Sequence, residues 1–243
     1  AREAGLAFTG AKKSGKEGDD SCFNGEFIED VFANDKIDLS RHQLVAGTAW
    51  LFSRADFQQQ FDYLFVDEAG QVSLANLVAL GQCARNIVLL GDQMQLGQPT
   101  KGTHPGRSGE STLEYLLNGH ATIAADRGIF LDTSYRMHPA ICGFISDAIY
   151  DGRLRAAESA AGQGLVLGAD AADALAASGI RYVPVVHEGN AQSSDEEARE
   201  VAALYGSLMR QRYLDNTGRA VPITPDDVLV VAPYNVQVNT LRQ

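Results

Sequence analysis

Two short apolar runs, FDYLFV at residues 61–66 and NIVLL at residues 86–90, set the pattern of this chain. Short apolar runs bounded by breaking residues are typical of strands buried in a parallel sheet. Between them, apolar residues recur near helical spacing over residues 73–84, and Ser73 stands where a helix N-cap is expected. The pattern predicts a strand–helix–strand unit whose two strands end at the same sheet edge.

Acidic residues follow both predicted strands. Asp67 and Glu68 come directly after the first run, and Asp92 comes shortly after the second. In open α/β sheets, ligands bind beyond the carboxyl ends of the strands. One acid for Mg²⁺ and one to orient or deprotonate water is the arrangement that phosphoryl transfer needs. Taken alone, the pair fits a solvated acidic turn equally well, and Asp92 is more typical of a turn than of a metal ligand.

The same alternation continues along the chain and predicts an α/β fold. Residues 1–40 are polar and irregular, residues 153–179 show little pattern, and lost periodicity over residues 118–128 predicts a boundary between two lobes. Further strands are predicted at residues 44–51, 129–131, 181–186 and 227–232. Further helices are predicted at residues 54–60, 111–117, 139–148 and 194–213.

Two of these helices carry clear start signals. Pro139 suits the first turn of a helix, and Ser194 with Glu197 forms the S-x-x-E pattern of a capping box. The first helix is expected to bury Ile141, Phe144, Ile145 and Ala148. The second is expected to bury Val201, Leu204, Tyr205 and Leu208.

Composition narrows the class of protein. The chain has 243 residues, 45% of them hydrophobic, and a formal net charge of −11, which counts against a simple nucleic-acid coat protein. No apolar run is long enough to span a membrane, and the first residues lack the core of a secretory signal. The three cysteines are far apart, which indicates reduced thiols and a cytoplasmic location.

Residues 10–16, GAKKSGK, fit the G-x-x-x-x-G-K pattern of a phosphate loop. The next residue is Glu17, where that motif needs Ser or Thr to reach Mg²⁺. The flanking segments also lack the strand and helix that such a loop joins. We expect a solvated charged loop here, whose Lys12, Lys13 and Lys16 are at most contacts for a phosphate backbone.

Several stretches, taken in order, resemble the motifs of one family. VDEAGQ at residues 66–71 and GDQMQLGQP at residues 91–99 resemble the Walker B segment and third motif of superfamily 1 helicases. SYRMHP at residues 134–139 and APYNVQV at residues 232–238 resemble blocks of the Upf-like branch, which includes the nonsense-mediated-decay helicase and the Okazaki-fragment nuclease-helicase. GTAW at residues 47–50 fits the nucleic-acid-contacting turn that precedes Walker B.

The resemblance implies parallel sheets with flanking helices, in parts of two RecA-like P-loop NTPase lobes. Residues 1–125 would hold the carboxyl half of the first lobe and residues 126–243 the first half of the second. It also implies an ATP-dependent helicase or translocase that uses ATP and Mg²⁺ on single-stranded nucleic acid, with no membrane partner. The motifs fit either DNA or RNA as the strand, and DNA is favoured. GTHPG at residues 102–106 and LFSRADF at residues 51–57 further resemble a bacterial subgroup with a RecB-like nuclease on the same polypeptide.

The resemblance also implies roles for single residues. Asp67 would hold Mg²⁺ through its water shell, and Glu68 would be the general base for the attacking water. Gln95 would sense the γ-phosphate and couple its hydrolysis to movement. Arg136 would stabilise charge on the transferred phosphoryl group, which suits a planar, always charged guanidinium.

Other positions are candidates for binding. Tyr234 and Gln237 are expected to contact the nucleotide or to brace the interface between the lobes. Thr48 is a candidate contact for the nucleic-acid strand, whereas Trp50 is expected in the core rather than in a base stack. The remaining candidates for that strand form one loop, Gln98, Pro99, Thr100 and Lys101.

A motor of this family also needs a Walker A loop and later motifs that follow the 227–232 run. Residues 10–16 fail as that loop, so we expect the chain to be a middle piece of a longer protein. On this interpretation the piece alone has little or no ATPase activity, whereas the longer protein is the enzyme.

Two other classes stay open at this point. A metal-dependent phosphoesterase would use Asp67, Glu68, Asp92 and His138, but its G-N-H-[DE] block does not occur, and His138 is more typical of a helix entry. A non-catalytic module that binds nucleic acid or docks a protein would keep the fold without the chemistry.

Overall fold

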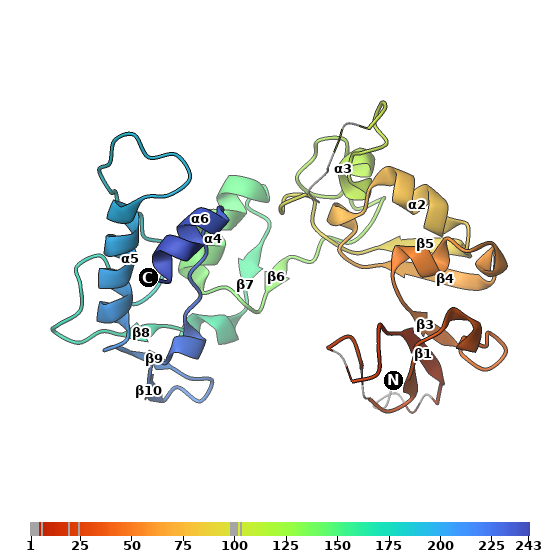
Figure 1. Cartoon of the computed structure of the whole chain (residues 1–243), viewed down its shortest axis with the longest axis horizontal. Helices are drawn as coiled ribbons and strands as arrows, with labels where there is room; N and C mark the ends of the chain where they lie inside the picture. Colours follow the sequence, from red (N-terminus) through yellow and green to blue (C-terminus); the bar gives the residue numbers. More distant parts are fainter. Residues whose placement is uncertain (1–4, 6, 19, 24, 98–101, 103) are drawn as a thin grey trace. The chain divides into compact units, whose positions relative to one another are not determined.

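A computed structural model describes residues 5, 7–18, 20–23, 25–97, 102 and 104–243 (Figure 1). The chain divides into two compact units, Ala1–Ala121 and Thr122–Gln243. Parallel strand pairs with helices beside them occur in both units, which confirms the predicted α/β class.

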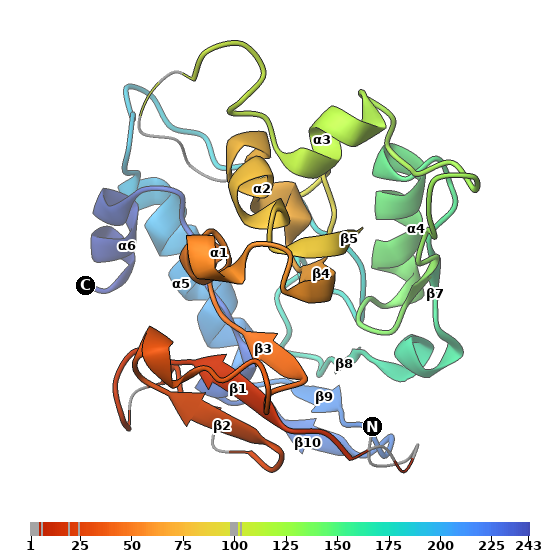
Figure 2. The same cartoon turned by 90° about the vertical axis from the view of Figure 1, so that its right-hand side faces the viewer.

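The first unit begins with a small parallel sheet. Strand β1 (Gly10–Lys13) lies between β2 (Ile28–Val31) and β3 (Leu44–Ala46), and both neighbours run parallel to it (Figure 2). The expectation of a solvated loop over residues 10–16 is therefore wrong for its first four residues. A polar strand is stable here because it is central, with both edges paired and Ala11 only 1% exposed.

Phenylalanines join this sheet to the next. After β3 come helix α1 (Ala49–Phe52) and a single 3₁₀ turn, Ala55–Phe57, which replaces the helix predicted over residues 54–60. Phe52 and Phe57 both pack against Phe61, with ring centroids 5.8 and 5.5 Å away and edge-on geometry. Such aromatic contacts fix the start of the following strand.

The predicted strand–helix–strand unit is confirmed. Strand β4 (Phe61–Val66) leads through a 3₁₀ turn, Ala69–Gln71, to α2 (Leu74–Gly81) and then to β5 (Ala84–Leu89). The two strands pair in parallel, so both end at one edge. Ser73 caps α2 by accepting the amide of Asn76 at 3.3 Å.

The unit closes with helix α3 (Thr112–Leu117), whose N-cap Ser111 accepts the amide of Glu114 at 3.1 Å. Asn118 and Gly119 end it with positive φ angles of 49° and 84°. Left-handed residues of this kind commonly terminate helices. Thr112 fixes α3 to the turn before α2, since its amide and hydroxyl both donate to the carbonyl oxygen of Val72.

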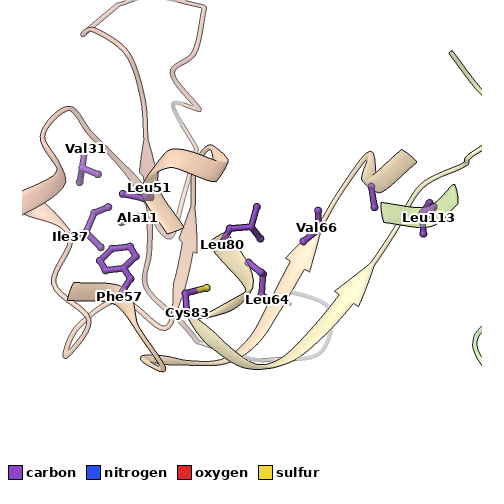
Figure 3. Packing of buried hydrophobic residues seen from close by; sticks show 11 residues of the cluster. Ala11, Val31, Ile37, Leu51, Phe57, Leu64, Val66, Leu80, Cys83 and Leu113 are labelled. Carbon is purple, nitrogen blue, oxygen red and sulfur yellow. The ribbon is translucent and has the colours of Figure 1, made fainter. Parts of the chain in front are cut away.

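One buried cluster underlies both sheets of the first unit (Figure 3). Leu64 and Val66 of β4 pack with Leu80 and Cys83 on the face that α2 covers. The same cluster continues into the first sheet and includes Ala11, Val31, Ile37, Leu51, Phe57, Ala69 and Leu113. The alternate side chains of β4 are exposed instead, Tyr63 by 59% and Phe65 by 65%.

The second unit has two small sheets. Strands β6 (Thr133–Ser134) and β7 (Arg155–Ala156) pair in parallel beside α4 (Pro139–Ile149). Strands β8 (Leu165–Val166), β9 (Arg212–Leu214) and β10 (Ala220–Pro222) form an antiparallel sheet in the order β10-β9-β8. The remaining elements are α5 (Asp195–Leu208), α6 (Asn235–Leu241) and the 3₁₀ turns Asn34–Lys36 in the first unit, Glu158–Gly162 and Pro225–Asp227.

Three predicted strands of this unit do not form. Residues 129–131, 181–186 and 227–232 include no strand, and the helix predicted over residues 194–213 ends earlier, so that its last residues begin strand β9. Apolar side chains in all three runs lie open, among them Leu131 at 78%, Val186 at 94% and Leu229 at 86% exposed. Such runs become buried strands only where neighbours pair with their backbone and cover both faces.

Helix α4 begins as predicted but buries a different stripe. Pro139 is its first residue, and His138 caps it by accepting the amide of Ala140 at Nδ1, 3.1 Å away. Cys142 and Ser146 are the buried residues, whereas Phe144 is 60% exposed. The stripe shifts because the loop after α4 packs on Ser146, whose hydroxyl accepts the amide of Leu154 at 3.0 Å.

Candidate nucleotide site

The edge where β4 and β5 end brings two loops together. The amide of Ala69 donates to the carbonyl oxygen of Leu90 at 2.8 Å, and the amide of Leu90 donates to that of Val66 at 2.9 Å. These bonds extend the parallel pairing past the last strand residues. Asp67 and Glu68 therefore lie on one loop, directly beside the loop that carries Asp92.

Two glycines allow these loops to touch. A Cβ on Gly70 would lie 2.4 Å from the carbonyl oxygen of Asp92, and a Cβ on Gly91 would lie 2.7 Å from the backbone nitrogen of Ala69. Gly91 also has a φ of 152°, which side chains rarely allow. The motifs V-D-E-A-G and G-D thus contact each other through their backbones. Both glycines belong to these motifs, but the motifs alone do not reveal the contact.

Glu68 has an unusual backbone. Its φ of 52° and ψ of 40° are left-handed, and its amide donates to Oδ1 of Asp67 at 2.9 Å. For a residue other than glycine this conformation costs on the order of 1 kcal/mol or more, and such strain clusters at functional sites. The side chains of Asp67 and Glu68 both stay exposed at this turn.

Asp92 organises the second loop. Its Oδ1 accepts the amide of Met94 at 2.9 Å, and its Oδ2 accepts the side-chain amide of Gln95 at 3.1 Å. The neighbouring Gln93 reaches the opposite way and donates to the carbonyl oxygen of Ala121 at 2.6 Å. Asp92 therefore acts as the turn residue that its sequence context predicts, and it binds the side chain of Gln95.

The donor set suits Mg²⁺. This ion keeps several waters and takes one or two carboxylates together with substrate phosphates. Exposed Asp67 can supply such a ligand at the strand edge. Among the residues that the structure describes, no group of three or more His, Cys, Asp or Glu side chains is placed to hold a metal ion. The metal-dependent phosphoesterase alternative gains no support from this geometry.

In the segment that fits G-x-x-x-x-G-K, Ser14 binds a carboxylate of the chain itself. Ser14, only 1% exposed, donates from its hydroxyl to Oδ1 of Asp30, and the amide of Phe23 donates to both oxygens of Asp30 at 3.0 and 2.9 Å. The ammonium group of Lys13 donates to the carbonyl oxygen of Ser14 at 2.6 Å. Ser14 is thus bound to a carboxylate of the same chain, in agreement with the failed motif.

Arg136 belongs to the second unit. It lies in the exposed turn between β6 and α4, where the amide of Met137 donates to the hydroxyl of Ser134 at 3.3 Å. With Tyr213 and Asp227 it lines a cavity of about 760 Å³ in that unit. The neighbouring negative charge of Asp227 raises the pKa of Tyr213.

The buried side chain of Gln237 connects α6 to the start of α5 through hydrogen bonds. It is 7% exposed, accepts the amide of Ser194 at 2.7 Å and donates to the carbonyl oxygen of Ser194 at 3.1 Å. Ser194 meanwhile caps α5 as predicted, by accepting the amide of Glu197 at 3.1 Å. Tyr234 precedes α6 and is 49% exposed. The expected contacts of Tyr234 and Gln237 with nucleotide stay predictions.

Of the candidate nucleic-acid contacts, the structure describes Thr48 but not the loop of residues 98–101. Thr48 is exposed at the start of α1, and its side chain does not cap that helix. The nearby Trp50 is 84% exposed, so its expected place in the core is wrong. The other candidates, Gln98, Pro99, Thr100 and Lys101, lie outside the described residues.

The three cysteines are free thiols, and two of them, Cys83 and Cys142, are buried. Burial raises the pKa of Cys83, which keeps this thiol protonated and unreactive. Cys142 is buried on α4.

Comparison with known proteins decides the family. Two family profiles, each described as an AAA domain, match residues 21–101 and 109–243, and the second alone covers more than half of the chain. DNA-binding protein SMUBP-2 of Mesocricetus auratus is 31% identical over 196 residues, which are 76% of this chain and 19% of that protein. The chain belongs to the AAA-domain helicases of superfamily 1.

Other helicase relatives agree with this placement in the Upf-like branch. DNA polymerase alpha-associated DNA helicase A of Schizosaccharomyces pombe is 28% identical over 195 residues, 76% of this chain and 28% of that protein. The human 3'-5' exoribonuclease HELZ2 is 29% identical over 232 residues, 86% of this chain and 7% of that protein. The chain thus spans a third or less of the length of these curated relatives, and it is a helicase-type segment of RecA-like folds.

None of the helices in the described part of the chain has the length and apolar character that crossing a bilayer requires.

Proposed function

We propose that the protein containing this helicase segment hydrolyses ATP with Mg²⁺ and uses the energy to move along single-stranded nucleic acid. The observation that carries the proposal is the interlocked edge of β4 and β5. There, Gly70 and Gly91 hold the acidic pair beside the Asp92–Gln95 loop at contact distance. Strand ends of this kind are where nucleotides bind in α/β sheets.

In this proposal the two adjacent acids have separate roles. Asp67 holds Mg²⁺ through water, and the ion, when bound, neutralises charge on the nucleotide phosphates. Glu68 accepts a proton from the attacking water. The exposure of both carboxylates and the left-handed turn at Glu68, a kind of strain that clusters at functional sites, support this division.

Gln95 is proposed to sense the γ-phosphate. Its side-chain amide donates to Asp92, whose other oxygen fixes the turn at Met94. A nucleotide that draws Gln95 away would break the bond between these two side chains. Movement at the ATP edge would thereby change the loop that leads to residues 98–101, the proposed contacts of the nucleic-acid strand.

Arg136 is proposed to stabilise charge on the transferred phosphoryl group. The side chain is exposed in a turn that the Ser134 hydroxyl and the start of α4 fix. Its guanidinium keeps its charge at any physiological pH and can bind two oxygens at once. A contribution on the order of 10³-fold in rate is typical for an arginine in this role.

DNA is the proposed strand, rather than RNA. The names of two relatives refer to DNA, namely DNA-binding protein SMUBP-2 and DNA polymerase alpha-associated DNA helicase A. The resemblance of residues 51–57 and 102–106 to nuclease-bearing proteins supports a nuclease domain on the same polypeptide. A cytoplasmic location is proposed from the free thiols.

The test is ATP hydrolysis by the full-length protein with Mg²⁺, measured with and without single-stranded DNA. Glu68→Gln keeps the size of the side chain and removes the base, so turnover should fall by about 100-fold or more while nucleotide binding persists. Asp62→Asn is the matched control, because it neutralises an exposed carboxylate at the opposite end of β4. It should leave turnover unchanged.

Arg136→Ala should lower kcat with little effect on nucleotide affinity, as expected for a contact made in the transition state. Equal losses of binding and turnover would instead assign Arg136 to ground-state binding. ATP turnover that survives Glu68→Gln would show that the acidic pair has no catalytic role.

A further inference from the structure

The indole of Trp50 is held away from the protein. It is the only tryptophan of the chain, and 84% of it is exposed. Tryptophan normally buries a large apolar area and contributes strongly to cores and interfaces. An exposed position for this residue is therefore unfavourable unless another molecule covers the ring.

Its neighbours fix this orientation. Leu51, the next residue of α1, is 3% exposed and belongs to the main buried cluster, which Phe52 also contacts. Gly47 lies so close to α1 that a Cβ there would approach Leu51 Cδ2 to 2.5 Å. Because α1 is anchored through these contacts, its turn directs Trp50 outward.

Polar and charged residues lie on the segments next to Trp50. Thr48, two residues earlier, is exposed and does not cap α1. Lys13 ends strand β1, and its Cβ lies 3.4 Å from the position of a Cβ on Gly47. The pairing of Lys12 with Ala46 places the ends of β1 and β3 at the same sheet edge. Trp50, Thr48 and Lys13 therefore belong to neighbouring segments of the first unit.

These three groups match the parts of a single strand of nucleic acid. Bases stack on aromatic side chains whatever their sequence, and phosphates bind lysine and hydroxyl groups. A duplex does not fit, because its base faces are covered by their neighbours. The nearby Arg54 adds little, since Asp56 binds its guanidinium at 2.9 and 2.7 Å.

We propose that Trp50 stacks on a base of single-stranded DNA while Lys13 and Thr48 contact the adjacent phosphate. This inference rests on the proposed function and adds a base-stacking residue to it. Binding at this edge therefore needs bases as well as phosphates, and it tolerates any base sequence.

The experiment uses the 243-residue chain and oligothymidylate. Because Trp50 is the only tryptophan, its fluorescence reports stacking directly, and it should be quenched on binding. An abasic oligomer of equal length offers the same phosphates without bases. It should bind more weakly and leave the fluorescence unchanged.

Variants separate stacking from charge, with affinities measured by anisotropy of a labelled oligonucleotide. Trp50→Ala should weaken binding about 5- to 150-fold without changing its salt dependence. Trp50→Phe keeps a ring and should recover part of that loss. Lys13→Ala should instead lower the slope of log affinity against log salt by about 1. Tyr63→Ala, which removes another exposed aromatic from the same unit, is the control and should bind like the wild type.

Two results would overturn the stacking role. One is wild-type binding without quenching, and the other is equal affinity of Trp50→Ala and wild type. Neither result would contradict the proposal of ATP-driven movement, because the Glu68→Gln assay tests that proposal separately. Wild-type chain that binds no oligonucleotide in low salt would refute this contact whatever the ATPase assay shows.

Discussion

Replacing Gly70 with alanine tests whether the two motif loops interlock as described. The added Cβ would lie 2.4 Å from the carbonyl oxygen of Asp92 and 2.9 Å from its carbonyl carbon. Ordinary contact begins at 3.4 Å, so the loops must separate by about 1 Å. The obstacle is backbone, which cannot rotate away as a flexible side chain would.

The cost follows from packing and hydrogen bonding. Overpacking of this kind typically costs about 1–3 kcal/mol. Separation of the loops also weakens the bond from the Ala69 amide to Leu90, which is 2.8 Å long and contributes about 1 kcal/mol. We expect Gly70→Ala to lower the free energy of unfolding of the first unit by about 2–3 kcal/mol.

Urea unfolding followed by far-ultraviolet circular dichroism measures this loss. With a slope of about 1–3 kcal/mol per molar urea, the midpoint should fall by roughly 0.7–3 M. Hydrogen exchange should rise in peptides that cover residues 61–70 and 84–92. Gly97→Ala is the control, because a Cβ there meets nothing within 4 Å, and its midpoint should not move. If Gly70→Ala unfolds at the wild-type midpoint with unchanged exchange, the loops are not interlocked.

Two more predictions concern the second unit. Gly143 lies inside α4, and a methyl group added there would meet nothing within 4 Å. Gly143→Ala should therefore stabilise the helix by about 0.5–1 kcal/mol, which is measured as a higher melting temperature. An unchanged or lower melting temperature would contradict this. Hydrogen bonds from the hydroxyl and amide of Thr224 lower the pKa of Asp227. Because the folded pKa is depressed, this stabilisation is complete above the ordinary carboxyl pKa and is lost as pH falls through the lowered value. Asp227→Asn should therefore make the melting temperature less sensitive to acid, and an unchanged pH profile would contradict the assignment.

Local sequence signals are sufficient for the elements around the acidic pair. The β4–α2–β5 unit is predictable because its strands are short apolar runs and Ser73 supplies its own cap. The starts of α4 and α5 are predictable for the same reason, since Pro139 and Ser194 act on their own first turns. Motif order likewise indicates the helicase family without any knowledge of the fold.

Pairing partners account for what local patterns could not predict. β1 has the sequence GAKK, which is typical of a loop, yet two neighbours pair with it. The run at residues 227–232 is far more apolar and forms no strand. A strand is stable when its backbone groups find partners, and those partners are remote in sequence.

The acidic pair shows the same division between local pattern and three-dimensional packing. That Asp67 and Glu68 follow a buried strand can be read along the chain, because an apolar run that stops at two charges marks the end of such a strand. That Gly70 and Gly91 lock this pair against Asp92, and that Leu51 turns Trp50 outward, is visible only in the folded molecule. Both features depend on close approach between segments, which composition and spacing along the chain do not encode.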